Sequence, residues 1–326
     1  MNQLFRWDQM GLFLLALAAG ILPFAVPEVC AAALREGLTL CSGPLLLSLF
    51  PFLVVSRLLI QCPESDLLAL LFRLAAWGIG IRTPCAARVL CIGFLGGFAP
   101  AASAAAQAVR TGQLTAEEAD ALLPACICSG PSFVVLTVGQ SLLGSAELGV
   151  LLFASQITAN YLTAALLNRF VGVRSVKPGS AAPASPAPPR LDEILADAAI
   201  TYCKLCGFIL FFRMLAAGAG ALLPAGAGTL CSILLEVCSG CDLASRTRRW
   251  GSLLCCAALS VQGLSVLLQV RTICPPEMTL RPLYRARLLH LPLSLALFYL
   301  LLPGGEADVF STLPARVLLM RRVPPD

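Results

Sequence analysis

Three ionisable side chains lie inside or at the ends of strongly apolar runs. Glu236 is the one acid deep in such a run, LCSILLEVCSG, and Arg57 and Arg213 each follow a phenylalanine by five residues in two similar segments. Because charge in a membrane is costly, such residues usually face the protein interior and pair there. We therefore expect Arg57, Arg213 and Glu236 to be charge-pair candidates, with Glu236 alternatively a proton or cation ligand. Otherwise the arginines extend to a membrane surface, and Glu236 makes only a structural hydrogen bond at a turn.

Small and helix-breaking residues interrupt four apolar runs, at 96–101 and 129–132 in the first half and at 236–240 and 260–265 in the second. Such breaks persist in a membrane only where they are buried in protein or line a wet cavity. Matched breaks in two halves indicate a central solute site. The alternative is close helix packing, which Gly, Ala and Ser also permit. The residues at or near the breaks that we expect to bind solute are Gly97, Pro100, Ser103, Gln107, Ser129, Gly130, Pro131, Ser132, Glu236, Ser239, Gly240, Gln262, Gly263, Ser265 and Gln269.

The breaks have a definite chemistry. N–H groups at the start of a half-helix favour anions or polar solute oxygens, whereas the carbonyls at opposed half-helix ends suit cations. The Ser and Gln side chains beside the breaks add neutral hydrogen bonds.

Other chemistries have weaker support. Fifteen cysteines are present, and Cys203-x-x-Cys206 with Cys238-x-x-Cys241 could in principle form a four-cysteine zinc or iron–sulfur site. Most cysteines, however, lie among Ala, Leu and Gly, where a thiol behaves as a small hydrophobe, and His290 is the only histidine. We expect no metal and no cofactor. The absence of paired carboxylates or an activated nucleophile argues against an enzyme, and the absence of a Lys/Arg block argues against nucleic acid as a partner.

The elements that must position these residues are membrane helices. The chain is 58% hydrophobic and 13% charged, with a mean hydropathy of +0.85, whereas soluble domains carry about 25% charged residues. The expected fold class is all-α, a polytopic membrane protein. We expect an uncleaved first span rather than a signal peptide. The expected spans are 10–34, 39–60, 147–168, 196–218 and 283–302, with broken spans at 119–143 and 250–270, re-entrant hairpins at 84–108 and 225–240, and a short helix at 66–81.

A Pro-, Ala- and Ser-rich stretch at 171–190 reads as a linker between two halves. Basic residues at both of its ends place it in the cytoplasm by the positive-inside rule. The expected domains are an N-terminal span (1–38), a first repeat (39–170), the linker (171–190), a second repeat (191–304) and a tail (305–326). The resulting topology favours inverted repeats. It leaves Arg246, Arg248 and Arg249 outside, which a direct-repeat topology would avoid.

Several spaced motifs resemble one membrane family. They are Gly97-Phe98-Ala99-Pro100, Arg110, Leu114-Thr115-Ala116-Glu117-Glu118, Ser129-Gly130-Pro131, Glu236-Val237, Gly263-Leu264-Ser265-Val266 with Gln269, and Arg287-x-x-His290. Over residues 45–300 the chain resembles the YlbJ-type sporulation integral membrane proteins, which belong with the nucleoside-recognition, or Gate-domain, proteins. Related Gate elements occur in concentrative nucleoside transporters and FeoB-type iron transporters. The chain departs from the family at Cys126-Ile127-Cys128, where polar residues including an Asn are usual, and at Leu267, where a His is usual.

The resemblance implies a function and a location. It implies a permease-like or gating protein for a small polar solute that acts in sporulation, in spore cortex or envelope formation. The implied location is a bacterial inner membrane, in the mother cell or forespore, with lipid and an unknown solute as partners and a homo-oligomer as one expected state. The alternative is a structural or assembly protein of the sporulation membrane that does not transport.

Overall fold

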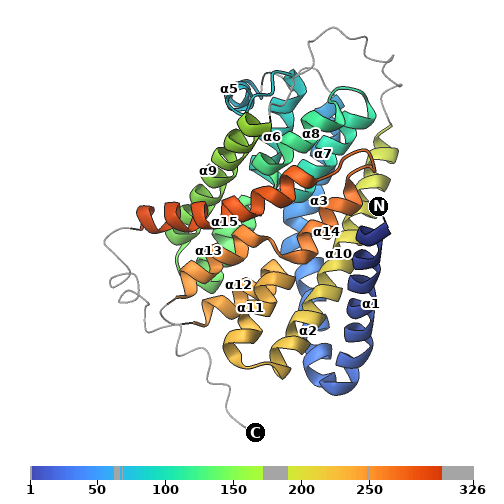
Figure 1. Cartoon of the computed structure of the whole chain (residues 1–326), viewed down its shortest axis with the longest axis vertical. Helices are drawn as coiled ribbons and strands as arrows, with labels where there is room; N and C mark the ends of the chain where they lie inside the picture. Colours follow the sequence, from blue (N-terminus) through green and yellow to red (C-terminus); the bar gives the residue numbers. More distant parts are fainter. Residues whose placement is uncertain (1, 62–66, 68, 172–189, 248–249, 303–326) are drawn as a thin grey trace.

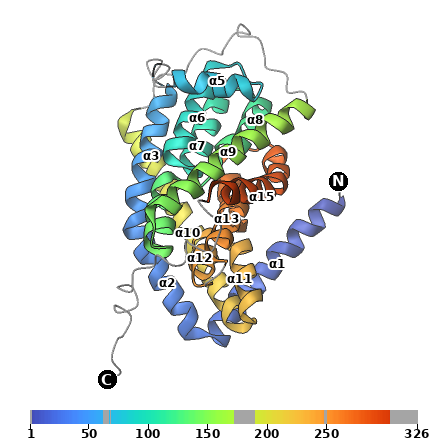
Figure 2. The same cartoon turned by 90° about the vertical axis from the view of Figure 1, so that its left-hand side faces the viewer.

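A computed structural model describes residues 2–61, 67, 69–171, 190–247 and 250–302, and these residues form helices joined by turns and short irregular segments, without a strand (Figure 1). Both views show the helices of residues 70–126 at one end of the molecule and those of residues 225–245 toward the other (Figure 2). The all-α fold class is confirmed. Most of the 171–190 linker and the whole 305–326 tail lie outside the described residues.

The N-terminal helices do not follow the expected spans. They are α1 (Asn2–Ala25), α2 (Pro27–Ser42) and α3 (Pro44–Gln61). The boundaries 10–34 and 39–60 were wrong because Pro27 and Pro44 each begin a new helix. Proline lacks the N–H that a helix interior needs, but it fits the first helical position, where that N–H has no partner.

The remaining helices of the first half are α5 (Leu70–Gly78), α6 (Pro84–Gly96), α7 (Phe98–Arg110), α8 (Ala116–Cys126), the π-helix η1 (Ser132–Leu142) and α9 (Ala146–Val171). The two expected interruptions are confirmed. Gly97 joins α6 to α7, and residues 127–131 separate α8 from η1.

The second half is also made of helices. It contains α10 (Leu191–Leu222), α11 (Ala225–Leu235), α12 (Val237–Ser245), α13 (Gly251–Val261), α14 (Gly263–Ile273) and α15 (Arg281–Leu301). The two interruptions expected here are also confirmed. Glu236 separates α11 from α12, and Gln262, in the left-handed conformation, separates α13 from α14.

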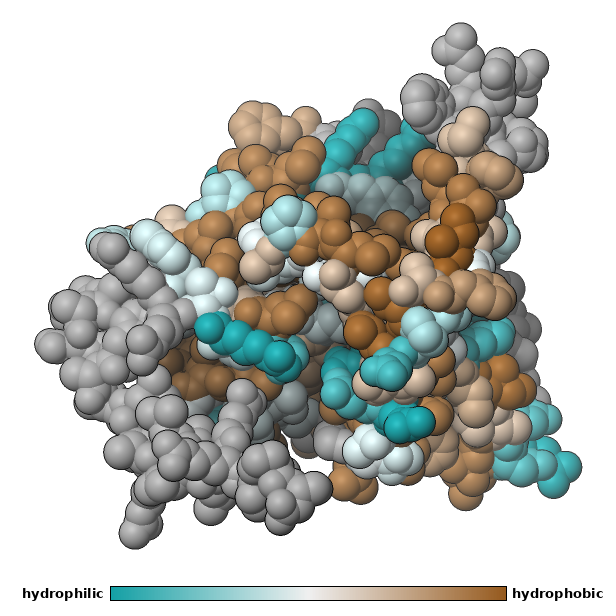
Figure 3. Space-filling model, turned by 90° about the horizontal axis from the view of Figure 1, so that it is seen from below, coloured by the Kyte–Doolittle hydropathy of each residue, from teal (hydrophilic) through white to brown (hydrophobic). Residues whose placement is uncertain are grey.

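Four helical stretches are long and apolar enough to cross a membrane: Pro27–Leu47, Ala146–Phe170, Leu191–Leu222 and Gly251–Ile273. The expected span at 283–302 is not among them, because Arg285, Arg287 and His290 lower the hydropathy of α15. Many large apolar side chains are exposed, and much of the face in Figure 3 is hydrophobic. Length, composition and surface together indicate a membrane protein.

An aspartate in the first half accepts hydrogen bonds from the second half. Asp120 on α8 is buried, and its carboxylate accepts hydrogen bonds from the Thr279 backbone N–H (2.8 Å), the Thr279 hydroxyl (2.7 Å) and the Leu280 N–H (3.1 Å). Leu280 is the N-cap of α15 and has a positive φ of 57°. Asp120 therefore sets where α15 begins.

We expect Asp120→Ala to lower stability by roughly 1.5–3 kcal/mol, because hydrogen bonds to a charged group are lost and buried donors stay unsatisfied. The measurement is thermal unfolding of the purified protein in detergent, followed by tryptophan fluorescence. Glu117→Ala, at an exposed position on the same helix, is the control and should melt with the wild type. Equal melting of the two variants would contradict this role of Asp120.

Candidate functional site

Within each half, one helix interruption lies directly on the other. A Cβ atom added to Gly97 would lie 2.6 Å from the backbone nitrogen of Gly130, and one added to Gly263 would lie 3.0 Å from that of Glu236. Both glycines have positive φ angles, 81° and 67°, which glycine adopts without steric cost. The α6–α7 junction therefore packs on the α8–η1 break, and the α11–α12 junction packs on the α13–α14 break.

The pair of interruptions in the second half also contacts the pair in the first half. The Gln262 side-chain amide donates to the Ser129 hydroxyl (3.3 Å) and to the Leu259 carbonyl (2.6 Å), and Gln262 is fully buried. Through this contact all four interruptions form one connected group.

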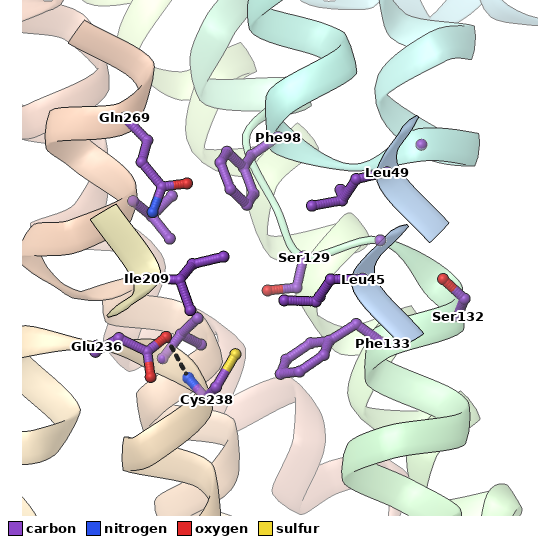
Figure 4. A pocket seen from close by; sticks show the side chains of 14 residues that line it. Leu45, Leu49, Phe98, Ser129, Ser132, Phe133, Ile209, Glu236, Cys238 and Gln269 are labelled. Carbon is purple, nitrogen blue, oxygen red and sulfur yellow. Dashed lines mark hydrogen bonds between the residues drawn. The ribbon is translucent and has the colours of Figure 1, made fainter. Parts of the chain in front are cut away.

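A small cavity lies at this meeting point (Figure 4). Its volume is about 40 Å³, which is room for a few water molecules. We call it the central cavity. Its walls come from both halves: Leu45, Leu49, Gly96, Phe98, Ser129, Gly130, Ser132, Phe133, Ile209, Glu236, Val237, Cys238, Val266 and Gln269.

Glu236 caps a helix in the wall of this cavity. Its carboxylate accepts hydrogen bonds from the N–H groups of Cys238 (2.8 Å) and Ser239 (2.7 Å), at the start of α12 (Figure 4). These groups have no partner within the helix. Among the described residues, no Lys or Arg nitrogen lies within 4.0 Å of the carboxylate. The geometry matches the alternative of a structural hydrogen bond at a turn.

The two arginines pair with other acids. Arg57 contacts Asp197 at 2.6 Å, and Arg213 contacts Glu36 at 2.6 Å. Each arginine thus pairs with an acid other than Glu236. The arginines are 11% exposed, whereas Asp197 and Glu36 are 61% and 65% exposed. Since the acids are largely solvated, these pairs add little stability; they fix positions on α10, which carries one member of each.

Each ion pair lines a further cavity. The first, which we call the basic cavity, measures about 190 Å³ and includes Arg57, Asp197, Arg110, Lys204 and Gln269. It holds three basic groups and one acid, and Gln269 also lines the central cavity.

The second, which we call the mixed cavity, measures about 650 Å³ and includes Arg213, Glu36, Asp242, Arg246 and Ser239. Its two arginines and two acids balance in charge. Ser239 of the mixed cavity contacts a residue of the central cavity, since its backbone N–H donates to Glu236.

The other expected site residues have varied places. Ser103 lines the basic cavity. The Ser265 hydroxyl accepts from the Gln269 amide at 2.9 Å. A Cβ on Gly240 would lie 2.8 Å from the Ile233 Cα, so this glycine lets α12 pack on α11. The expected residues that are not among the linings of these three cavities are Gly97, Pro100, Gln107, Pro131, Gly240, Gln262, Gly263 and Ser265.

Sequence reasoning missed a buried polar group behind the breaks. Arg287 on α15 donates to the carbonyls of Ile127 (2.9 Å) and Ser260 (3.3 Å) and to the Asn160 side-chain oxygen (3.3 Å). Asn160 also donates to the Ile127 carbonyl at 3.2 Å. Gln156, one turn before Asn160 on α9, donates to the Ser260 hydroxyl at 2.9 Å.

Two sequence signals could have found this group. Gln156, Asn160 and Asn168 repeat at intervals of four and eight residues along an expected span, so they share one helix face. Arg287 and His290 lie near the start of another expected span, where polar residues are rare.

Within the described part of the chain, no three His, Cys, Asp or Glu side chains are grouped to hold a metal ion. Cys203, Cys206, Cys238 and Cys241 therefore do not form a four-cysteine site there. No family model matches the chain, and no curated protein or solved structure matches it.

The contact between breaks makes a steric prediction. We expect Gly97→Ala to lower stability more than Gly80→Ala. Both glycines have a positive φ, 81° and 89°, but a Cβ on Gly80 meets nothing within 4 Å. The excess loss has two sources: overpacking against Gly130, typically about 1–3 kcal/mol, and the ψ of −162° at Gly97, which residues other than glycine rarely adopt. Thermal unfolding in detergent measures the difference in stability between the two variants. Indistinguishable melting of the two would contradict the close contact between Gly97 and Gly130.

Proposed function

We propose that this chain is a multi-pass membrane permease for a small polar solute, built from two inverted repeats. The observation that carries the proposal is the contact among four helix interruptions beside one small cavity, together with two further cavities that each contain an ion pair. Interrupted membrane helices that meet at a repeat interface are typical of solute sites in secondary transporters.

The matching order of helices supports the repeats. Each half has a long helix (α3 or α10), a helix pair joined at a break (α6–α7 or α11–α12), a broken helix (α8–η1 or α13–α14) and a closing helix (α9 or α15), and among the described helices from α3 to α9 only α5, between α3 and α6, has no counterpart in the second half. In this proposal the two joined pairs are re-entrant hairpins. The related arginines, Arg57 and Arg213, lie in different cavities, as expected if the two halves have opposite orientations. The 171–190 linker is then cytoplasmic.

The basic cavity favours a solute with an anionic group. Arg57, Arg110 and Lys204 outnumber Asp197 there, and a cavity lined by one sign of charge concentrates the opposite sign. The central cavity, at about 40 Å³, is too small for such a solute, so the helices around it must separate for passage. The structure then represents a closed form.

The resemblance to the YlbJ-type proteins supports a role in sporulation, in the mother-cell or forespore membrane, during cortex or envelope formation. The second candidate is the assembly protein without transport. Its supporting observation is the central cavity itself, which is small and walled mainly by apolar side chains such as Leu45, Phe98 and Phe133, while Glu236 is already satisfied by helix N–H groups.

Uptake into proteoliposomes tests the permease. The probes are matched neutral and anionic solutes, namely uridine with its 5′-monophosphate and glucose with its 6-phosphate. We expect an anionic member to accumulate faster than its neutral partner. Lys204→Gln should slow that uptake roughly fivefold, since one charge in a solvated cavity contributes about 1 kcal/mol.

Arg281→Gln, at an exposed position on α15, is the control and should leave uptake unchanged. Faster uptake of the neutral partners would contradict the anionic class. No uptake of any probe by correctly inserted protein would favour the assembly alternative.

A strain that depends on this protein for sporulation separates the two candidates further. If the chain is a permease, Ser129→Ala with Glu236→Gln should reduce spore formation while membrane levels stay normal, because both residues line the central cavity. The matched control Ser141→Ala alters an exposed hydroxyl on η1. Full complementation by the double variant would support an assembly role.

A further inference from the structure

Arg287 is buried without an acidic partner. It is 8% exposed, and among the described residues no carboxylate oxygen lies within 4.0 Å of its nitrogens. Its recorded acceptors are two backbone carbonyls and one neutral amide. A buried cation with only neutral acceptors requires a source of negative potential nearby.

The ends of two half-helices supply that potential. Ile127 is the C-cap of α8, and Ser260 lies in the last turn of α13, next to the interruption at Gln262. The last carbonyls of a helix have no partner within the helix and carry partial negative charge. Arg287 therefore lies between two helix C-terminal ends, one from each half of the chain.

This position is one that transport proteins with broken helices use for a coupling ion. There, unwound carbonyls and half-helix C-terminal ends coordinate Na⁺ or bind protons. Here a guanidinium group attached to α15 makes contacts of that kind. Without it, the Ile127 and Ser260 carbonyls and the Asn160 side-chain oxygen would be left as a cluster of oxygen ligands.

We propose that Arg287 is a resident cation that replaces a bound coupling metal ion at the two half-helix ends. The site then needs no Na⁺ or K⁺ to hold the breaks together. The consequence of Arg287 for ion-coupled transport rests on the proposed function as a permease. Occupation by a cation can be measured without any transport, so failure to transport would leave this proposal open to its own test.

The test is chemical rescue of Arg287→Ala, purified in detergent and followed by thermal unfolding. We expect the variant to have a lower thermal midpoint than the wild type. Millimolar guanidinium chloride should restore at least half of the loss, in a saturable way, because the free ion fits the space left by the side chain. Choline chloride at the same concentration should restore none, and the wild type should not be stabilised by guanidinium.

Arg285→Ala is the matched control, since Arg285 is exposed on the same helix; it should keep the wild-type midpoint and show no rescue. Normal melting of Arg287→Ala, or equal effects of guanidinium and choline on it, would overturn the proposal.

A second measurement stands even if Arg287→Ala does not fold. The wild type is melted in NaCl, KCl and choline chloride at equal ionic strength. Equal midpoints are expected if the resident cation suffices, and a saturable rise specific to Na⁺ or K⁺ would refute it.

Discussion

An interrupted helix inside an apolar bundle exposes backbone groups that only the protein can satisfy, and this constraint organises the whole structure. At the start of α12 the carboxylate of Glu236 accepts two N–H groups. At the ends of α8 and α13, Arg287 donates to carbonyls of both halves. Glu236 thus completes its own helix locally, whereas Arg287 comes from a distant segment and connects the breaks of the two halves.

The same constraint explains why glycine occurs where the breaks touch. Gly97 lies against Gly130, and Gly263 lies against Glu236. A side chain at either contact would push one break from the other and open a gap beside unsatisfied backbone groups. The breaks must therefore approach closely if their backbone groups are to find partners within the protein. Glycine permits the close approach within each half, and Gln262 contacts Ser129 between the halves.

The positions of the breaks could be predicted from the sequence, because Gly, Pro and Ser in an apolar run interrupt a helix locally. The contacts that the breaks and the charged side chains make with distant residues could not be predicted. Arg57 and Arg213 were recognisable as buried cations, yet their acids, Asp197 and Glu36, lie on exposed faces more than a hundred residues away in sequence. The contacts of Arg287 could not be predicted, because its acceptors are mostly backbone carbonyls, which every residue has. Side-chain chemistry cannot reveal such a contact before the fold brings the carbonyls to it.

In the proposed repeats, the starts of α7 and α12 correspond but differ in their N-cap residues, and this difference bears on the proposed solute. In the second half the N-cap of α12 is Glu236, so the positive end of that helix already holds a carboxylate from the chain. In the first half the N-cap of α7 is Gly97, which has no side chain and makes no side-chain cap. Anions are favoured at a helix N-terminus because of its free N–H groups and its dipole. The α7 start therefore carries no acid of its own, but the Gly130 backbone packs directly against Gly97. For the proposed permease, repeats of similar helix order need not bind solute in similar ways.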